Sequence, residues 1–272
     1  MTIEQVVNRL LTYHPPVDED KTCDGFKCGN PADECTGIVT TCAVSIEVIR
    51  KTIKLGCNLI ITHEPTFYTH MDRTDWLIGK NSVFDEKIKL LDDYGIAIWR
   101  NHDHIHAHKP DGIFYGVMKE LEWESYLVDD PNRPSRFRLP TTTVRQLALF
   151  LQKKLQLNAV RIIGNVDGQV NLVAFCAHVL PFMGSEEQAT QLLNEVDVII
   201  PGELIDWTVA AYARDAGHLG MNKAILQIGH FSMEELGMKY AVNWIADIIE
   251  KEVPVHFVRS ADLYNYVDSN SL

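Results

Sequence analysis

Short apolar segments alternate with amphipathic segments along most of this chain, and this alternation restricts its fold more than any other feature. Three apolar segments span residues 37–42, 58–62 and 96–99, and segments with helical spacing of apolar residues, 46–53 and 82–94, separate them. The apolar segments are short and largely β-branched, which favours strands. Strands that alternate with helices in this way predict a parallel α/β sheet with right-handed crossovers.

A second series of this kind follows a polar, proline-containing segment from Leu121 to about Pro140, which we interpret as a linker. Before the first series, the sequence predicts a helix from Ile3 to Leu11 and a long loop from about Pro15 to Thr36. After the linker we expect helix 143–155, strands 159–163 and 170–177, helix 186–194, strand 196–200, helix 205–216, strand 224–228, helix 232–251 and strand 255–258. The sequence therefore predicts two αβ domains.

Composition narrows the classes of function. The chain has 272 residues, 46% of them hydrophobic and 23% charged, as expected for an ordinary globular protein. Its formal net charge of -12 argues against nucleic acid as the main partner, because affinity for phosphate backbones comes mostly from Lys and Arg. No signal-like or membrane-spanning run is present, so we expect a cytoplasmic protein with no membrane partner.

In the cytoplasm the six cysteines would remain thiols. They form no Cys-x-x-Cys pair, so their spacing does not indicate a structural zinc site built from them. Three of them, Cys23, Cys28 and Cys35, fall in the predicted N-terminal loop, and the sequence leaves their role open.

Four histidines at alternate positions follow the apolar segment 96–99. They are His102, His104, His106 and His108. In an extended chain all four would point the same way, whereas in a helix His102 would lie above His106, and His104 above His108. Imidazole is the commonest protein ligand for several first-row metals, although a solvated histidine-rich turn would give the same pattern.

Two further polar clusters follow predicted strands. His63 and Glu64 come directly after strand 58–62, and His230 and Glu234 come after strand 224–228. In open α/β sheets ligands bind outside the carboxyl ends of the strands, so we expect the three clusters to meet at one edge. Each cluster also has a plain structural explanation, as a polar strand end before Pro65 or as helix-start chemistry. Together, however, the imidazoles and carboxylates exceed what one tetrahedral zinc ion needs and suit two first-row ions.

The motifs around these clusters resemble those of the NIF-three-like family. These are toroidal, hexameric proteins with a dinuclear metal centre, often described as type-two GTP cyclohydrolases. The resemblance spans nearly the whole chain. It rests on Gly56–Pro65 against the family's strand ending T-H-H-P, Asn101–Ala107 against H-T-N-x-D-A, Gly229–Glu234 against G-H-x-x-x-E, Asp197–Glu203 against T-G-D or T-G-E, and Cys23–Gly29 against D-N-x-G-L-x-x-G.

The resemblance implies a NIF-three-like α/β fold of two αβ domains with mainly parallel or mixed sheets flanked by helices. Residues 1–125 and 226–272 would form a discontinuous metal-binding domain, and residues 126–225 an inserted second domain. It also implies a homohexamer.

Two departures from the family motifs balance each other. Glu64 stands where the family has its second histidine, and His106 stands where it has the aspartate of H-T-N-x-D. The ligand set implied by the resemblance is therefore His63, Glu64, His106, His230 and Glu234, which still contains three imidazoles and two carboxylates. We expect it to hold two divalent first-row ions (Zn, Fe, Mn, Co or Ni). Trp207 stands near the place where many relatives carry a further histidine.

Two functions from different classes fit this set. The first is a metal-dependent hydrolase acting on a small-molecule substrate that carries a phosphoester, a nucleotide or a cyclohydrolase-type ring. In it His102, His104 and Glu203 would be the side chains available for catalytic proton transfer. The second is a metal-binding interaction or chaperone-like protein without turnover. A third reading, from the H-x-H-x-D-H motif of metallo-β-lactamase-like hydrolases, lacks its aspartate and has Ala107 in place of a histidine.

Overall fold

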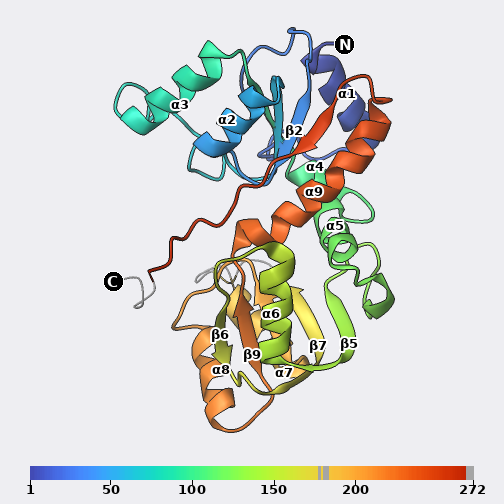
Figure 1. The fold of residues 1–272 in the computed structure, drawn as a ribbon, viewed down its shortest axis with the longest axis vertical. Helices are drawn as coiled ribbons and strands as arrows, with labels where there is room; N and C mark the ends of the chain where they lie inside the picture. The colour runs from blue at the N-terminus through green and yellow to red at the C-terminus, as the bar shows by residue number, and fades with distance from the viewer. Residues whose placement is uncertain (177–178, 180–183, 268–272) are drawn as a thin grey trace. The chain divides into compact units, whose positions relative to one another are not determined.

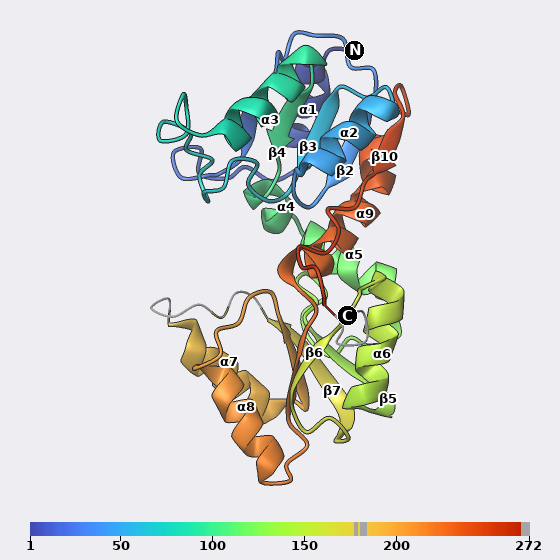
Figure 2. The same ribbon diagram turned by 60° about the vertical axis from the view of Figure 1, so that its left-hand side comes forward.

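A computed structural model gives the fold of the chain and describes residues 1–176, 179 and 184–267 (Figures 1 and 2). Contacts between residues divide the chain into two compact units. The first consists of Met1–Glu120 and Glu234–Ser260, and the second of Leu121–Met233 together with the described residues after Ser260. The sequence-based boundaries stand at 125/126 and 225/226.

The first unit is built on a five-stranded sheet in the order β1-β4-β3-β2-β10. Its strands are β1 (Gly25–Cys28), β2 (Ile38–Thr41), β3 (Leu59–Thr62), β4 (Ala97–Arg100) and β10 (Val255–Phe257). β10, β2, β3 and β4 run parallel, and β1 pairs antiparallel with β4. Because β10 pairs with β2, this sheet needs segments from both ends of the chain.

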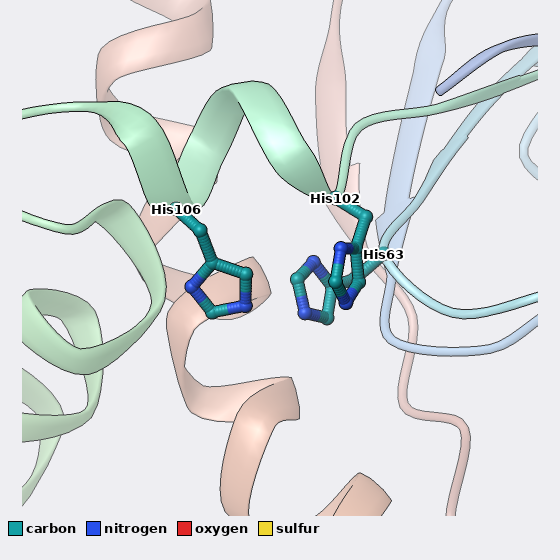
Figure 3. Close-up of side chains that lie close together, drawn as sticks. All are labelled: His63, His102 and His106. Atoms are coloured by element: carbon teal, nitrogen blue, oxygen red, sulfur yellow. The ribbon is translucent and has the colours of Figure 1, made fainter. Parts of the chain in front are cut away.

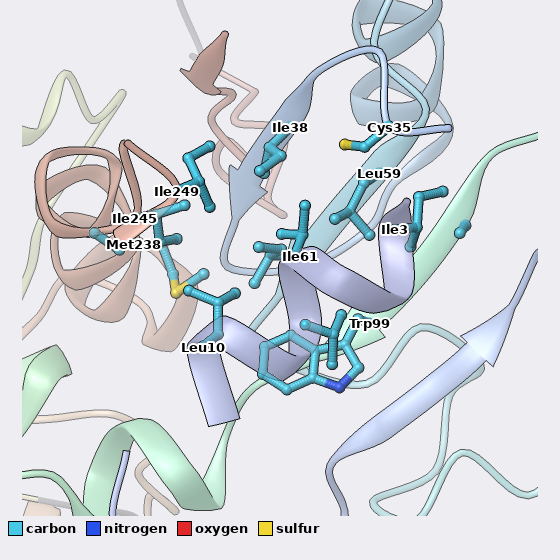
Figure 4. Packing of buried hydrophobic residues seen from close by; sticks show 14 of the residues in the cluster. Ile3, Leu10, Cys35, Ile38, Leu59, Ile61, Trp99, Met238, Ile245 and Ile249 are labelled. Atoms are coloured by element: carbon cyan, nitrogen blue, oxygen red, sulfur yellow. The ribbon is translucent and has the colours of Figure 1, made fainter. Parts of the chain in front are cut away.

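Helices cover both faces of this sheet, because alternate strand residues point to opposite sides. Leu59 and Ile61 pack with α1 (Ile3–Tyr13) and α9 (His230–Ile248), in the core that Figure 4 shows. Ile60 instead packs in a second core that includes residues of α2 (Ile46–Lys54) and α3 (Ser82–Asp93). Burial on both faces explains why these strands are continuous apolar runs.

Local signals fix where the helices of the first unit begin. Thr2 caps α1 through a capping box with Gln5, and the Ser45 side chain accepts a hydrogen bond from the Val48 amide at the start of α2. Two further helices, α4 (Asp103–Ala107) and α5 (Gly112–Leu121), follow β4.

The second unit contains another five-stranded sheet, in the order β5-β7-β8-β9-β6. Its strands are β5 (Arg136–Thr143), β6 (Arg161–Gly164), β7 (Gln169–Cys176), β8 (Val198–Pro201) and β9 (Ala224–Gln227). The three central strands run parallel, and the two edge strands run antiparallel to their neighbours. The predicted α/β class with mainly parallel or mixed sheets is confirmed for both units.

Helices also flank the second sheet. Its helices are α6 (Val144–Leu155), α7 (Ser185–Glu195) and α8 (Val209–His218), preceded by the short 3-10 helix η1 (Glu124–Tyr126). Ala174, Ile199 and Ile225 pack with residues of α7 and α8. Figure 2 shows α6 on the other side of the sheet, where its Phe150 stacks on Trp123.

The structure corrects three sequence-based expectations. The predicted loop 15–36 contains β1, and the predicted linker 121–140 contains η1 and most of β5. β9 belongs to the second sheet, so the cluster that follows it does not share a sheet edge with the clusters after β3 and β4. Ala177, the last residue of one predicted strand, lies outside the described residues.

No helix in the described part of the chain is long and apolar enough to cross a membrane.

Candidate metal centre

The first two polar clusters lie side by side in the first unit. β3 and β4 are parallel neighbours with Thr62 paired to Arg100, so the residues that follow them emerge at the same edge. His63 and Glu64 continue from β3, while Asn101 and His102 lead from β4 into α4. The convergence predicted for these two strand ends is confirmed.

The histidine string forms a short helix, which separates its members into two pairs. His102 and His106 lie one turn apart and face the end of β3 (Figure 3). The His63 ring stacks on the His102 ring with centroids 4.5 Å apart and meets the His106 ring edge-on at 4.9 Å. His108 instead stacks on Tyr13, with ring centroids 4.5 Å apart. Helical geometry thus brings one pair of the string to His63.

Two carboxylates complete this site. The His63 Nε2 atom lies 3.3 Å from Glu234 Oε2, and ligand atoms of His63, Glu64 and Glu234 all lie within 4.8 Å of one another. The same limit holds for ligand atoms of His63, His102 and His106. His63 is 0% exposed, and both glutamates are buried. Imidazoles and carboxylates collected in this way are a typical ligand set for first-row ions.

The three histidines share an orientation that suits metal ligation. In each, Nδ1 meets an oxygen acceptor: the Asn101 carbonyl at 3.3 Å from His63, Asp103 Oδ1 at 2.9 Å from His102, and Asp111 Oδ2 at 2.9 Å from His106. When Nδ1 donates its proton to such an acceptor, Nε2 carries the free lone pair, as in metal-bound histidines. The buried His63 Nε2 has no hydrogen-bond partner among the described residues. This orphaned nitrogen beside two carboxylates fits a divalent cation.

Electrostatics at the site follow from burial and the carboxylates. Burial alone would lower the pKa of His63, but the charges of the nearby Glu234 and Glu64 carboxylates outweigh it, so that this pKa is raised. Burial and the neighbouring His63 and His106 lower the pKa of His102 to about 4. His102 is therefore neutral at pH 7, as a metal-ligating imidazole must be.

Arg100 is a buried cation behind the site. It is 0% exposed, and its Nε donates to the His63 carbonyl at 3.0 Å. Its Nη2 lies 3.6 Å from Glu64 Oε2, and its Nη1 lies 3.5 Å from Asp72 Oδ2. The guanidinium therefore offsets carboxylate charge at the place where this chain carries Glu64.

The remaining predicted residues lie elsewhere. His104 is buried, and its Nδ1 bonds to Asp24 Oδ2 at 2.7 Å. Glu203 and His230 both belong to the second unit, where the His230 Nδ1 bonds to Glu203 Oε1. They line a pocket of about 360 Å³. In the described part of the chain, none of His104, Glu203 and His230 belongs to a group of neighbouring ligand atoms. The Trp207 side chain is 66% exposed. The assignment of His230 as a ligand stays a prediction.

Sequence reasoning missed the carboxylates that orient the site. Asp103 stands inside the histidine string and could have been suspected from that position. Asp111 lies beyond it, and its other oxygen accepts from the Ile113 and Phe114 amides at the start of α5. An N-cap aspartate is so common that its second role had no signal in the sequence.

Fold and site together define an α/β protein with a buried cluster of histidines and glutamates suited to metal binding. The chain belongs to the Duf34/NIF3 (NGG1p interacting factor 3) family, whose sequence model matches residues 1–262. The resemblance inferred from the motifs is confirmed.

Comparisons with individual proteins agree with this family. The chain is 23% identical over 246 residues to a protein of Clostridium acetobutylicum named GTP cyclohydrolase 1 type 2 homolog, covering 86% of this chain and 85% of that protein. Among solved structures, a Bacillus cereus protein related to NIF3 has a TM-score of 0.72 at 14% identity. A Staphylococcus aureus protein has a TM-score of 0.71 at 18% identity. Each alignment covers 98% of this chain and 99% of the other. These similarities show a shared fold.

Proposed function

We propose that this protein is a metal-dependent hydrolase whose centre, built on His63, Glu64 and Glu234, holds two divalent first-row ions. The observation that carries the proposal is the His63 imidazole, which is fully buried, bonded to a carbonyl through Nδ1, and without a hydrogen-bond partner at Nε2 beside two buried carboxylates. Burying such polar atoms is costly unless something satisfies them. A bound cation would do so.

The other residues of the site support this role. His106, oriented by Asp111, is the further imidazole beside His63, and the predicted ligand His230 comes four residues before Glu234 on α9. Arg100 holds the His63 carbonyl and lies beside Glu64, so it fixes the position of both ligands. Bound ions of this kind polarise a phosphoryl or carbonyl oxygen and lower the pKa of a bound water.

The substrate class is a small molecule with a phosphoester, nucleotide or cyclohydrolase-type ring. The name of the Clostridium relative supports trying GTP, and the general chemistry of two-metal sites supports trying phosphomonoesters and phosphodiesters. Proton transfer by His102, His104 or Glu203 stays a prediction that variants of each can test.

The experiment compares turnover of this panel by protein loaded with Zn, Mn, Fe, Co or Ni. The test variant is His63→Ala/Glu234→Gln, and the matched control is His218→Ala/Glu187→Gln, which changes an exposed histidine and an exposed glutamate. We expect metal-dependent hydrolysis of at least one substrate class by wild type and control, and a loss of 100-fold or more, about the effect of removing key catalytic groups, in the test variant.

Stoichiometric metal without turnover of any substrate would contradict the hydrolase. That outcome would favour the alternative, a metal-binding interaction protein, which the family name, NGG1p interacting factor 3, also suggests.

A further inference from the structure

A buried thiol lies next to the histidine string. Cys23, which precedes β1, is 2% exposed, and its Sγ lies within 4.8 Å of ligand atoms of both His102 and Asp103. This group shares His102 with the group of His63, His102 and His106, and it shares no residue with the group of His63, Glu64 and Glu234. It is therefore a set of donors that adjoins the metal centre through His102.

The loop that carries Cys23 is fixed to α4 by two aspartates. Asp103 Oδ2 accepts from the Thr22 hydroxyl at 2.8 Å and from the Cys23 amide at 3.0 Å. In return, Asp24 accepts from the backbone amides of His102, Asp103 and His104, at 2.5, 3.1 and 2.9 Å. These bonds tie the thiol, the imidazole and the carboxylate to one rigid junction between loop and helix. Such preorganisation is what a metal site requires of its ligands.

The orientation of His102 leaves a choice between the two sides of its ring. Nδ1 lies 2.9 Å from Asp103 Oδ1, whereas Nε2 lies 4.0 Å from Glu64 Oε1. An ion held by the thiol and Asp103 would bind His102 at Nδ1, in place of the hydrogen bond between Nδ1 and Asp103. His102 would then carry its proton on Nε2, which faces Glu64, and would not be a ligand of the centre on His63. The Cys23 thiol also hydrogen-bonds to Asp103, so the three side chains form one connected cluster.

We propose that Cys23, His102 and Asp103 hold a divalent ion that prefers sulfur, such as zinc, in addition to the centre on His63, Glu64 and Glu234. Thiolate, imidazole and carboxylate are all zinc ligands, and a thiolate excludes hard ions such as Mg²⁺ and Ca²⁺.

Binding of the metal ion displaces one proton and moves another. The metal–sulfur bond forms as the Cys23 S–H bond breaks, and that proton leaves to solvent. The His102 proton moves from Nδ1 to Nε2, which frees Nδ1 and the facing Asp103 oxygen for the ion.

The test uses Co²⁺, because a cobalt–thiolate bond gives a charge-transfer band in the near ultraviolet that nitrogen and oxygen ligands do not give. The full-length protein is stripped with chelator and titrated with Co²⁺. We expect the band in wild type, its loss in Cys23→Ser, and its retention in Cys35→Ser. Cys35 is the matched control because it is also buried, at 3% exposed, and its Sγ bonds to the Gly37 carbonyl.

The outcomes separate this proposal from the proposed function. Cobalt bound with no thiolate band, or a band that survives in Cys23→Ser, overturns the thiolate site and leaves the centre on His63 standing. Failure to bind cobalt at all overturns both. If Cys23→Ser does not fold, cadmium NMR of the unmutated protein decides, since a thiolate moves the cadmium signal downfield of any site with only nitrogen and oxygen. A signal in the nitrogen and oxygen range alone would overturn the proposal.

Discussion

Replacing Arg100 with methionine tests how the buried charges of the site balance. The change keeps an apolar stem of similar length but removes the guanidinium that the structure pairs with Glu64 and Asp72. Both carboxylates are inside the first unit, with side chains 10% and 2% exposed. Removing one partner of a buried ion pair costs about 3–5 kcal/mol, because the remaining charge loses its compensation. We expect Arg100→Met to lower the free energy of unfolding of the metal-free protein by about that amount.

Bound metal should reduce the difference in stability between Arg100→Met and the wild type. In the variant, a cation bound at Glu64 is no longer repelled by the positive charge of Arg100. We therefore expect saturating Zn²⁺ to stabilise Arg100→Met more than it stabilises the wild type. The assay is urea unfolding followed by tryptophan fluorescence, with and without Zn²⁺. The control is Arg9→Met, which removes an exposed ion pair with Glu252 and should cost less than about 1 kcal/mol.

The result that would refute this reasoning is a loss in Arg100→Met no larger than that in Arg9→Met. Equal stabilisation of wild type and Arg100→Met by Zn²⁺ would separately show that Glu64 is not near the ion.

Three further predictions concern the metal ligands and the packing of the first unit. Asp111→Asn keeps the helix-capping oxygen but removes the acceptor of the His106 Nδ1 proton, so we expect 10–100-fold weaker metal binding by calorimetry, about the usual cost of losing such a partner; an unchanged Kd would contradict this. Because the pKa of His63 is raised, the proton competes with metal to higher pH than at an ordinary histidine, and affinity measured by calorimetry should still rise with pH above 6.5; an affinity that levels off below that pH would argue against His63 as a ligand. Gly116→Ala should lower stability by about 1–3 kcal/mol in the urea assay, because its Cβ would lie 2.7 Å from the Gly237 Cα; the stabilisation usual for an alanine in a helix would show that α5 and α9 can separate there.

Periodicity predicted most of the fold because most strands here are continuous apolar runs between helices of regular spacing. It failed at the sheet edges. β1 lies in a polar loop, and its pairing with β4 is interrupted between Phe26 and Cys28, so no alternating pattern marks it. In β5 the three exposed positions are Arg138, Pro140 and Thr141, and an edge strand tolerates such a proline whereas a central strand does not.

The candidate site was predictable where ligands follow strands directly. His63 and Glu64 could be selected from their positions directly after β3, whereas Glu234 follows a strand of the other sheet and was selected by the resemblance. The structure brings ligand atoms of all three residues together. The sequence did not decide which way His102 faces, because the alternating histidines fit a helix and a strand equally well. The structure decides it, because these residues form α4. Asp103 also accepts a hydrogen bond from the Cys23 amide at 3.0 Å, although the two residues are 80 positions apart in the sequence. No local sequence pattern encodes contacts between such distant segments.

The metal content of the protein tests the central claim most directly. Protein without a tag is purified without chelators, and metals are counted per chain by mass spectrometry in wild type and in His63→Ala/Glu234→Ala. We predict that the wild type exceeds this variant by about two first-row ions per chain. No stoichiometric metal in the wild type, or the same content in both proteins, would contradict a metal centre on these residues.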